Sequence, residues 1–161
     1  EKSPLSVRPH IICDILRPGL LAPEKFDLIC MFQVFDHIAD PGMLLDECFK
    51  ALKPGGGILC LNHDVEAFSA RLLGERSPII DIEHTYLYSK VTIGKILKDH
   101  GFNLRENGSA TNVYTLRYLV QLLPIPKNMK ISLISYFSNH RIGGLKLSVQ
   151  LGNLYQIAQK P

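Results

Sequence analysis

The sequence lacks the features that mark several classes of protein. None of its apolar runs reaches the roughly 18 residues that a membrane-spanning helix needs. The net charge of +3 is mild, whereas proteins dedicated to nucleic acids usually carry a concentrated basic face. No internal repeat and no low-complexity stretch is present. We therefore expect no stable membrane insertion and no nucleic-acid partner.

The cysteines do not form a metal or redox motif. Cys13, Cys30, Cys48 and Cys60 lie far apart, each beside apolar neighbours, and no CxxC pair exists. Zinc knuckles and thioredoxin-like sites depend on such pairs. The pattern predicts four buried free thiols in a reducing compartment, which favours a cytoplasmic protein.

The first half of the sequence combines apolar runs with helix signals. Residues 11–16 form a short apolar run bounded by prolines, which predicts a buried strand, and residues 26–34 form a continuous run, as in the strands of a parallel sheet that is covered on both faces. Asp40 and Pro41 suit the N-cap and the first position of a helix, which the segment 53–57 (KPGGG) ends. A third apolar run follows the glycines. This order of strand, strand, helix and strand predicts an α/β domain with parallel strands.

The second half adds helices and two late strands. Alternation of apolar and polar residues over 145–151 predicts a strand with one wet face, and a second strand, 154–158, follows the turn Gly152-Asn153. Because a short turn joins these strands, we expect an antiparallel edge on the sheet. Ser89 suits the N-cap of a helix that Gly101 ends. The expected helices cover residues 65–73, 90–100, 118–123 and 129–137, and a further strand starts over 102–105.

Four motifs follow one another along the chain. They are Phe26-Asp27-Leu28-Ile29, Val34-Phe35-Asp36-His37, Asp40-Pro41 and Leu52-Lys53-Pro54-Gly55-Gly56. In this order they resemble class I S-adenosylmethionine-dependent methyltransferases of the small-molecule type 11/12 branch, where glutamate usually stands at the position of Asp36. Segments 84–89, 100–102 and 152–161 match the same family. The resemblance implies an incomplete Rossmann-like α/β sheet with helices on both faces and an antiparallel C-terminal strand pair.

The glycine-rich turn of this family, GxGxG, does not occur in the sequence. The triplet at 55–57 is no substitute, because it precedes a strand and does not open a helix after one. The missing turn, together with a sequence that starts at Glu1, predicts that residues 1–161 are the C-terminal part of one methyltransferase domain. We expect this part alone to be inactive and to bind the cofactor weakly. Residues 116–144 resemble the family least, and we expect a helical insertion or lid there, with core cover or a membrane-contacting helix as alternatives.

The resemblance implies that the cofactor is S-adenosylmethionine and that it binds where the strands end. Asp14 stands where the family has an acidic residue that accepts a hydrogen bond from the adenine amino group, beside the backbone amide of Ile15. The methionine part passes the end of the next strand, where Gln33 is polar after an apolar run. The alternatives are a solvated Asp14 and plain core packing of Val34. The predicted cofactor-binding residues are Asp14, Ile15, Phe32, Gln33, Val34 and His37.

His37 and His63 are the candidate catalytic residues. Both follow strand ends, and histidine exchanges protons near neutral pH, as a base for an acceptor hydroxyl or amine must. The alternative for His37 is a hydrogen bond to loop backbone. Asp36, His37, His63 and Asp64 are ligand types for a divalent metal, but their spacing requires none, so we predict no metal site. The predicted substrate-binding residues are Asn62, Asp64, His84 and Tyr86.

The sequence thus predicts an S-adenosylmethionine-dependent methyltransferase that acts on a small molecule or biosynthetic intermediate, as part of a longer protein. The alternative is a non-catalytic binding or interaction module with the same fold. The order of the DH, DP and LKPGG motifs disfavours a dehydrogenase. Without preceding strands, the run 26–34 becomes an apolar sheet edge. We expect that residues 11–16 collapse beside this edge or that self-association covers it.

Overall fold

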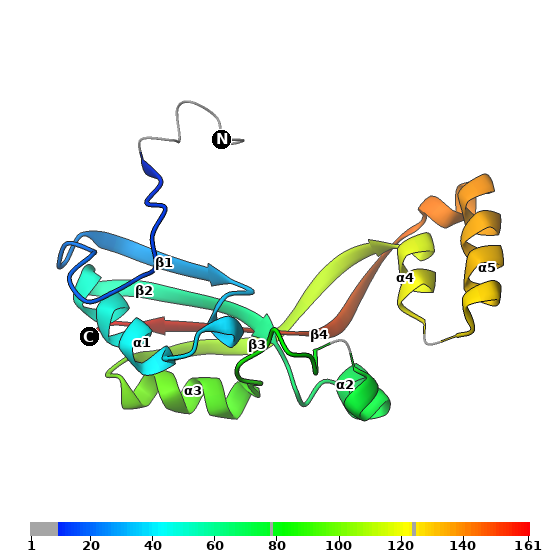
Figure 1. The fold of residues 1–161 in the computed structure, drawn as a ribbon. Helices are drawn as coiled ribbons and strands as arrows, with labels where there is room; N and C mark the ends of the chain where they lie inside the picture. Colours follow the sequence, from blue (N-terminus) through cyan, green and yellow to red (C-terminus); the bar gives the residue numbers. More distant parts are fainter. Residues whose placement is uncertain (1–9, 78, 124) are drawn as a thin grey trace.

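A four-stranded sheet forms the framework of the computed structural model, which describes residues 10–77, 79–123 and 125–161 (Figure 1). The strands are β1 (Phe26–Phe32), β2 (Leu52–His63), β3 (Asn103–Thr115) and β4 (Lys146–Gln159). They stand in the order β1-β2-β4-β3. β1 and β2 are parallel, whereas β4 is antiparallel to both β2 and β3. The predicted α/β class is confirmed, and the C-terminal part of the sheet is antiparallel as predicted, although the pair consists of β3 and β4.

Helices connect these strands. No helix of the described residues is long and apolar enough to cross a membrane. Two helices form after residue 116, near the expected ranges 118–123 and 129–137, and Figure 1 shows them at the tip of the long β3–β4 ribbon. Their role as an insertion or lid stays a prediction. The α-helices are α1 (Pro41–Ala51), α2 (Phe68–Leu73), α3 (Lys90–Asp99), α4 (Leu116–Leu122) and α5 (Lys127–Asn139), and the short 3-10 helices are η2 (Phe35–His37), η3 (Gly74–Arg76) and η4 (Arg141–Gly144).

Local capping signals set the ends of α1 and α3. The Asp40 carboxylate accepts a hydrogen bond from Met43 N at 2.9 Å, at the start of α1. Ser89 and Thr92 form a reciprocal capping box at the start of α3. Gly101 follows α3 with a φ of +87°, which suits glycine at a helix end. α1, however, ends at Ala51, before the glycines that were expected to cap it.

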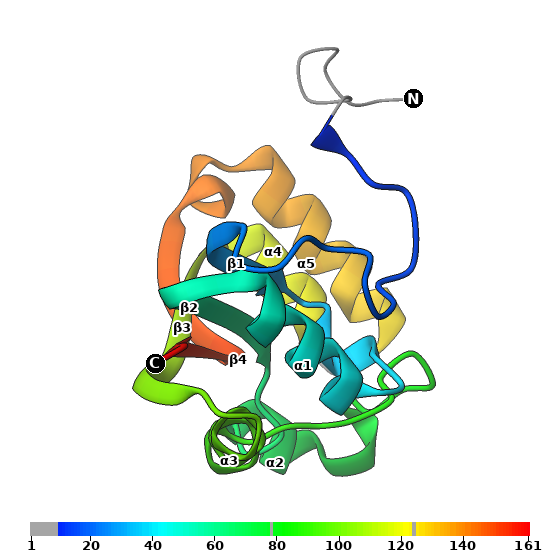
Figure 2. The same ribbon diagram turned by 90° about the vertical axis from the view of Figure 1, so that its left-hand side faces the viewer.

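The core lies between one face of the sheet and the helices α1 and α3, which Figure 2 shows on the same side. Ile58 and Cys60 of β2 and Leu154 of β4 point into it and are fully buried. Phe49 of α1 packs edge-on against Phe102, with ring centroids 5.1 Å apart, so the two helices share one apolar layer. This layer fixes the carboxyl ends of β1 and β2, where the candidate site is built.

The opposite face of the sheet is open over β1 and β2. We expected helices on both faces, and in the described residues the long helices α1 and α3 cover one. Leu28 and Phe32 of β1 are more than half exposed on the open side. The strand register places Leu59 and Leu61 of β2 next to Cys30 and Phe32 on that side. β1 is also the edge strand of the described sheet, as expected.

Residues 11–16 form no strand, so that prediction was wrong. The segment is an irregular coil in which Ile11, Ile12 and Ile15 are exposed. A short apolar run becomes a strand only where a neighbouring strand pairs with its backbone groups. In the described sheet the only neighbour of β1 is β2.

The turn predicted at Gly152-Asn153 was also wrong. β4 runs without interruption from Lys146 to Gln159, and Gly152 adopts a φ of +92° inside it. Its carbonyl accepts a hydrogen bond from the Asp64 amide at 2.8 Å. The glycine therefore marks an irregularity within one strand. The antiparallel partner of β4 at the end of the sheet is β3, and not a strand of its own hairpin.

The expectation of four buried thiols holds for two. Cys48 and Cys60 are buried in the core, and burial raises their pKa to about 11 and about 12. Cys13 and Cys30 are exposed. Cys13 lies in the coil that replaces the expected first strand, and Cys30 lies on the open face of β1.

Candidate active site

A buried carboxylate organises the carboxyl end of β1. The chain leaves β1 through Gln33, whose φ of +53° turns the backbone, and enters η2, where Asp36 is 1% exposed. The Asp36 carbonyl accepts hydrogen bonds from the amides of Thr85 and Tyr86, at 2.9 and 3.2 Å. These bonds fix the loop before α3 against the strand end. Segments about 50 residues apart in the sequence thereby meet at one point.

The Asp36 carboxylate bonds to two side chains at the end of β2. His63 Nδ1 donates to Oδ2 at 2.8 Å, and Asn62 Nδ2 donates to Oδ1 at 3.2 Å. Burial alone favours the neutral carboxyl group. The hydrogen bond from His63 and the charges of His63 and His37 outweigh it, so the pKa of Asp36 lies below its usual value. The carboxylate is thus ionised and holds the His63 ring in one orientation.

Three imidazole rings surround this carboxylate. His84 Nε2 lies 3.9 Å from Asp36 Oδ2, and the His84 ring stacks on His37 with centroids 4.7 Å apart. The centroid of His63 lies 4.8 Å from that of His84, nearly edge-on. His37 Nδ1 donates to the Glu83 carbonyl at 2.8 Å. This is the hydrogen bond to loop backbone that was the alternative to a catalytic role for His37. His37 Nε2 lies 3.9 Å from Asp36 Oδ1, so His37 also borders the cluster.

The cluster also has the composition of a metal site. Ligand atoms of Asp36, His63 and His84 all lie within 4.8 Å of one another. The short bond between Asp36 and His63 accounts for their approach without an ion. His84 Nδ1 lies 2.9 Å from Asp81 Oδ1 but out of line for a hydrogen bond. The arrangement is therefore a hydrogen-bonded cluster of one carboxylate with the neighbouring imidazoles.

Gln33 lies between exposed apolar side chains at the end of β1. Phe32 and Val34, on either side of it, are both exposed. Gln33 Nε2 donates to Asn153 Oδ1 at 3.3 Å, which ties β1 to β4. Its other side-chain atom, Oε1, is buried and has no partner among the described residues. A free buried acceptor beside an apolar surface fits a ligand that donates a hydrogen bond there.

The predicted substrate residues lie around the end of β2. Asn62 is fully buried and its Oδ1 has no hydrogen-bond partner in the described part of the chain. Asp64 and Lys90 line a hollow of about 230 Å³ next to the cluster, with Lys90 Nζ 4.0 Å from the Asp64 carboxylate. Tyr86 is partly exposed, and its hydroxyl donates to the Ala39 carbonyl at 3.4 Å. Asn62 and His84 thus join the Asp36 cluster, and Asp64 lies beside it.

Asp14 and Ile15 are not part of this assembly. Asp14 accepts hydrogen bonds from the Ile15 amide at 2.8 Å and from the Arg17 guanidinium at 3.0 Å. The Ile15 side chain is 84% exposed. Because no strand forms there, Asp14 does not mark a strand end, and its role in adenine binding stays a prediction.

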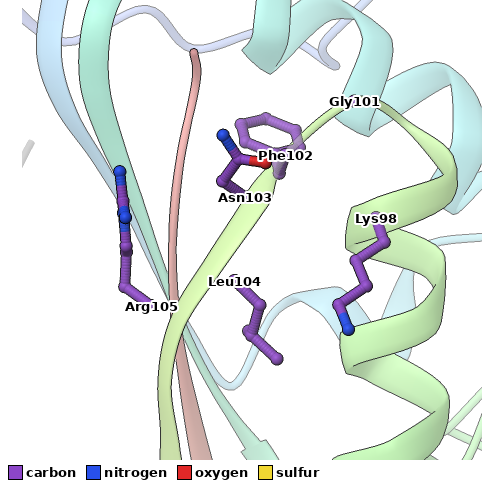
Figure 3. A pocket seen from close by; sticks show the side chains of 6 residues that line it. All are labelled: Lys98, Gly101, Phe102, Asn103, Leu104 and Arg105. Atoms are coloured by element: carbon purple, nitrogen blue, oxygen red, sulfur yellow. The ribbon is translucent and has the colours of Figure 1, made fainter.

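A larger hollow lies at the other end of the sheet. It has a volume of about 440 Å³ and lies where α3 leads into β3 (Figure 3). Lys98 and Arg105 border it, as Figure 3 shows, together with the start of β3. The first residues of β3 pair with the last residues of β4, and these in turn pair with the amino-terminal half of β2. This hollow is therefore separate from the Asp36 cluster, which lies at the carboxyl end of β2.

Comparison with known proteins identifies the family. A family model described as a methyltransferase domain matches residues 8–107, which is more than half of the chain. The chain belongs to the methyltransferase-domain family. The Asp36 cluster of this methyltransferase domain lies within the matched residues, whereas most of β3 and all of α4, α5 and β4 lie beyond them.

Two relatives of the methyltransferase domain are both named ubiquinone biosynthesis O-methyltransferase. The protein from Cereibacter sphaeroides is 38% identical over 55 residues, which cover 33% of this chain and 22% of the relative. The protein from Dinoroseobacter shibae is 40% identical over 77 residues, which cover 46% of this chain and 30% of the relative. The matched region therefore spans less than a third of the length of these relatives.

Solved structures share the fold of the methyltransferase domain. An S-adenosylmethionine-dependent methyltransferase from Thermotoga maritima superposes with a TM-score of 0.54 at 19% identity, covering 88% of this chain and 59% of the other. One from Archaeoglobus fulgidus gives 0.51 at 16% identity, covering 87% and 62%. The [4+2]-cyclase SpnF gives 0.52 at 14% identity, covering 88% and 52%. The fold is that of class I methyltransferases, and it also carries other chemistry.

Sequence reasoning missed parts of the site of this methyltransferase domain. Gln156, fully buried in β4, donates to the Lys90 carbonyl at 2.8 Å and keeps Oε1 unpaired. Asn153 binds Gln33. Asp36 was named only as a family variant and as a ligand type, although it is the centre of the cluster. A polar residue on the buried face of an otherwise apolar strand, such as Gln156, is a signal that was available in the sequence.

Proposed function

We propose that this chain provides the acid–base half of an S-adenosylmethionine-dependent methyltransferase site and that the acceptor atom is a hydroxyl oxygen. The observation that carries the proposal is the Asp36–His63 pair at the carboxyl end of β2. The family, the class I fold and the O-methyltransferase names of two relatives support it.

The Asp36–His63 pair has the geometry of a general base. His63 donates from Nδ1 to the ionised Asp36, so the neutral form of the ring would carry its free lone pair on Nε2. Nε2 can take the proton of an acceptor hydroxyl, and Asp36 then stabilises the imidazolium that forms. The His63 side chain is 26% exposed, so the ring is accessible at the rim of the site.

The residues at the end of β1 fit the methyl donor. S-adenosylmethionine supplies a methyl group already activated by the sulfonium, so catalysis depends on positioning and on removing the acceptor proton. Gln33 would accept a hydrogen bond from the donor through its unpaired Oε1, beside the apolar Phe32 and Val34. Asp14, Ile15 and His37 remain in the proposed donor set by resemblance. The sequence contains no GxGxG turn, so we propose that the activity belongs to a longer protein.

The acceptor is proposed to be a small molecule with an acidic hydroxyl, such as a phenol. A phenol, with a pKa of about 10, lies within reach of a histidine base, whereas an aliphatic alcohol does not. Asn62, whose Oδ1 is buried and unpaired in the described residues, would accept a hydrogen bond from a second donor group of the acceptor, such as the neighbouring hydroxyl of a catechol. His84 and Tyr86 would line the same side, and Asp64 would border it from the adjacent hollow.

The test replaces His63 by glutamine in the natural full-length protein. Methyl-labelled S-adenosylmethionine is incubated with a panel of phenols and catechols, and transfer of the label is followed at several pH values. We expect kcat to fall by about 10²–10⁴-fold, the usual contribution of a general base. We also expect the rise of the wild-type rate with pH to disappear, while the Kd of S-adenosylmethionine stays the same.

A second histidine–aspartate pair provides the matched control. His100 Nδ1 bonds to Asp46 Oδ1 at 2.7 Å, at the far end of α3. His100→Gln removes a bond of the same kind outside the cluster and should leave the rate and its pH profile unchanged. An unaltered rate for His63→Gln would exclude the base role. Binding of S-adenosylmethionine without transfer to any acceptor would favour the non-catalytic module.

A further inference from the structure

The charges of the chain are divided unevenly along its length. The 106 residues up to Glu106 carry 12 Lys and Arg against 15 Asp and Glu, whereas the following 55 carry six Lys and Arg and no acidic residue. The net charge of +3 is therefore the sum of −3 and +6. Such an asymmetry points to a surface that meets an anionic partner.

Most of these cations lie on one projecting part of the fold. We call residues 112–149 the helical arm: the outer ends of β3 and β4 with α4, α5 and η4. Figure 1 shows the arm beyond the carboxyl ends of β1 and β2, away from the α1–α3 layer. Its cations are Arg117, Lys127, Lys130, Arg141 and Lys146.

The arm also exposes apolar side chains. In the described residues, α5 contains no buried residue, although its sequence includes Met129, Ile131 and Tyr136. Ile131 is 56% exposed and Met129 is equally exposed. The exposed large apolar residues of the arm are Val113, Tyr118, Leu122, Leu123, Met129, Ile131, Tyr136, Ile142, Leu145 and Leu147.

The arm is held together by its own contacts, so this exposure is a property of a folded element. Tyr114 and Tyr118 stack with ring centroids 5.1 Å apart, which joins β3 to α4. Lys130 Nζ donates to the Gln121 carbonyl at 3.0 Å, which joins α5 to α4. The Leu116 amide donates to the Leu145 carbonyl at 2.9 Å and closes the base of the arm.

We propose that the helical arm docks on the surface of an anionic phospholipid bilayer. Exposed apolar residues and tyrosines alternate with cations along the sequence of the arm. This composition suits the bilayer interface, where apolar side chains enter the acyl boundary and cations meet lipid phosphates. A second copy of the arm would bring five cations against five, so charge opposes pairing of two arms. Nucleic acid would neutralise the cations but leave the aliphatic side chains in water. This proposal does not depend on the proposed methyl transfer.

Vesicle flotation tests the docking. The protein is mixed with vesicles of phosphatidylcholine alone or with added phosphatidylglycerol, at low and high salt. We expect flotation with the anionic vesicles only, weakened by salt because screening reduces the attraction of cations. Equal flotation with neutral vesicles, or none with anionic ones, would overturn the proposal.

Matched double variants locate the surface. Lys127→Glu with Ile131→Glu changes one exposed cation and one exposed aliphatic residue of α5, and should reduce anionic-vesicle affinity by about tenfold or more. Lys98→Glu with Val91→Glu makes the same change on the exposed side of α3 and should leave affinity within about twofold of wild type. An equal loss in both would show that overall charge, and not the arm, determines binding.

Further measurements control for unfolding of the variants and for other binding partners of the arm. Circular dichroism checks that the variants keep their helical content, and Lys127→Glu alone serves if the double variant loses it. Sedimentation without lipid and binding to a duplex DNA follow in parallel. If the arm mediated self-association or DNA binding and the protein did not float with vesicles, the partner of the arm would be a second copy or DNA, and the bilayer proposal would be refuted.

Discussion

At the scale of single residues, the face of the sheet on which a cysteine lies determines the reactivity of its thiol. Cys30 and Cys60 lie on neighbouring strands, β1 and β2, but Cys60 points into the α1–α3 layer and Cys30 onto the open face. Cys48 on α1 also faces the core. Burial raises the pKa of Cys60 to about 12 and that of Cys48 to about 11, so both stay protonated and unreactive at neutral pH.

Thiol labelling tests this division. With an aromatic disulfide reagent at neutral pH, the exposed Cys13 and Cys30 should react at once, whereas Cys48 and Cys60 should react only after guanidinium is added. Cys13→Ser with Cys30→Ser should abolish the fast phase and leave the slow one. A fast reaction of the buried pair in the native protein would contradict the burial described here.

The site was predictable residue by residue only in part. Strand ends indicated His37, Asn62 and His63, and the segment before the helix 90–100 indicated His84. These four do meet around Asp36. The centre itself was not evident, because nothing local shows that Asp36 is buried among residues from two other segments. Contacts of this kind depend on the register of β1 against β2, which no single segment encodes.

At the scale of elements, the capping box of α3 should contribute measurably to stability. Ser89 Oγ accepts from the Thr92 amide at 3.3 Å, and Thr92 Oγ1 accepts from the Ser89 amide at 2.8 Å. Ser89→Ala removes one bond and leaves a helix amide unpaired. We expect the free energy of unfolding to fall by about 1 kcal/mol. Urea denaturation followed by circular dichroism measures the change.

A serine elsewhere on a helix provides the comparison for this variant. Ser135 is exposed in the middle of α5, where alanine is a better helix former. Ser135→Ala should leave stability unchanged or raise it slightly. If Ser89→Ala were equally silent, the capping box would have no energetic role.

Elements with local signals were the ones that the sequence predicted well. α1 and α3 carry their own caps at Asp40 and Ser89, and both helices form at the expected place. The segment 11–16 and the turn at Gly152 failed for the opposite reason. A strand needs a neighbour, and a glycine with positive φ can occur in a turn or inside a strand, so only the assembled sheet decides.

At the scale of the whole molecule, motif order was more informative than composition. The FD, DH, DP and LKPGG motifs of this methyltransferase domain lie on β1, η2, the start of α1 and the start of β2, and of these only the DH motif belongs to the Asp36 cluster. The composition predicted only that the chain can bury a hydrophobic core. It did not show that the core would form on one face of the sheet and leave Leu28 and Phe32 exposed on the other.

This open face and the free edge of β1 should make the molecule associate with itself. An edge strand offers unpaired backbone groups to another chain, and exposed apolar side chains strengthen the contact. Leu28 is 56% exposed on β1, outside the Asp36 cluster. Sedimentation velocity at rising protein concentration should show a growing fraction of dimer or larger species for the wild type.

Leu28→Lys should shift this equilibrium toward monomer, because a lysine on an edge strand opposes pairing with a second strand. Val91→Lys, at a comparably exposed position on α3, places the same charge on the covered side of the sheet and should associate like the wild type. Wild-type protein that stays monomeric at every concentration would rule out association through β1. Equal loss of dimer in both variants would mean that added charge alone opposes association, and that the edge of β1 has no special part in it.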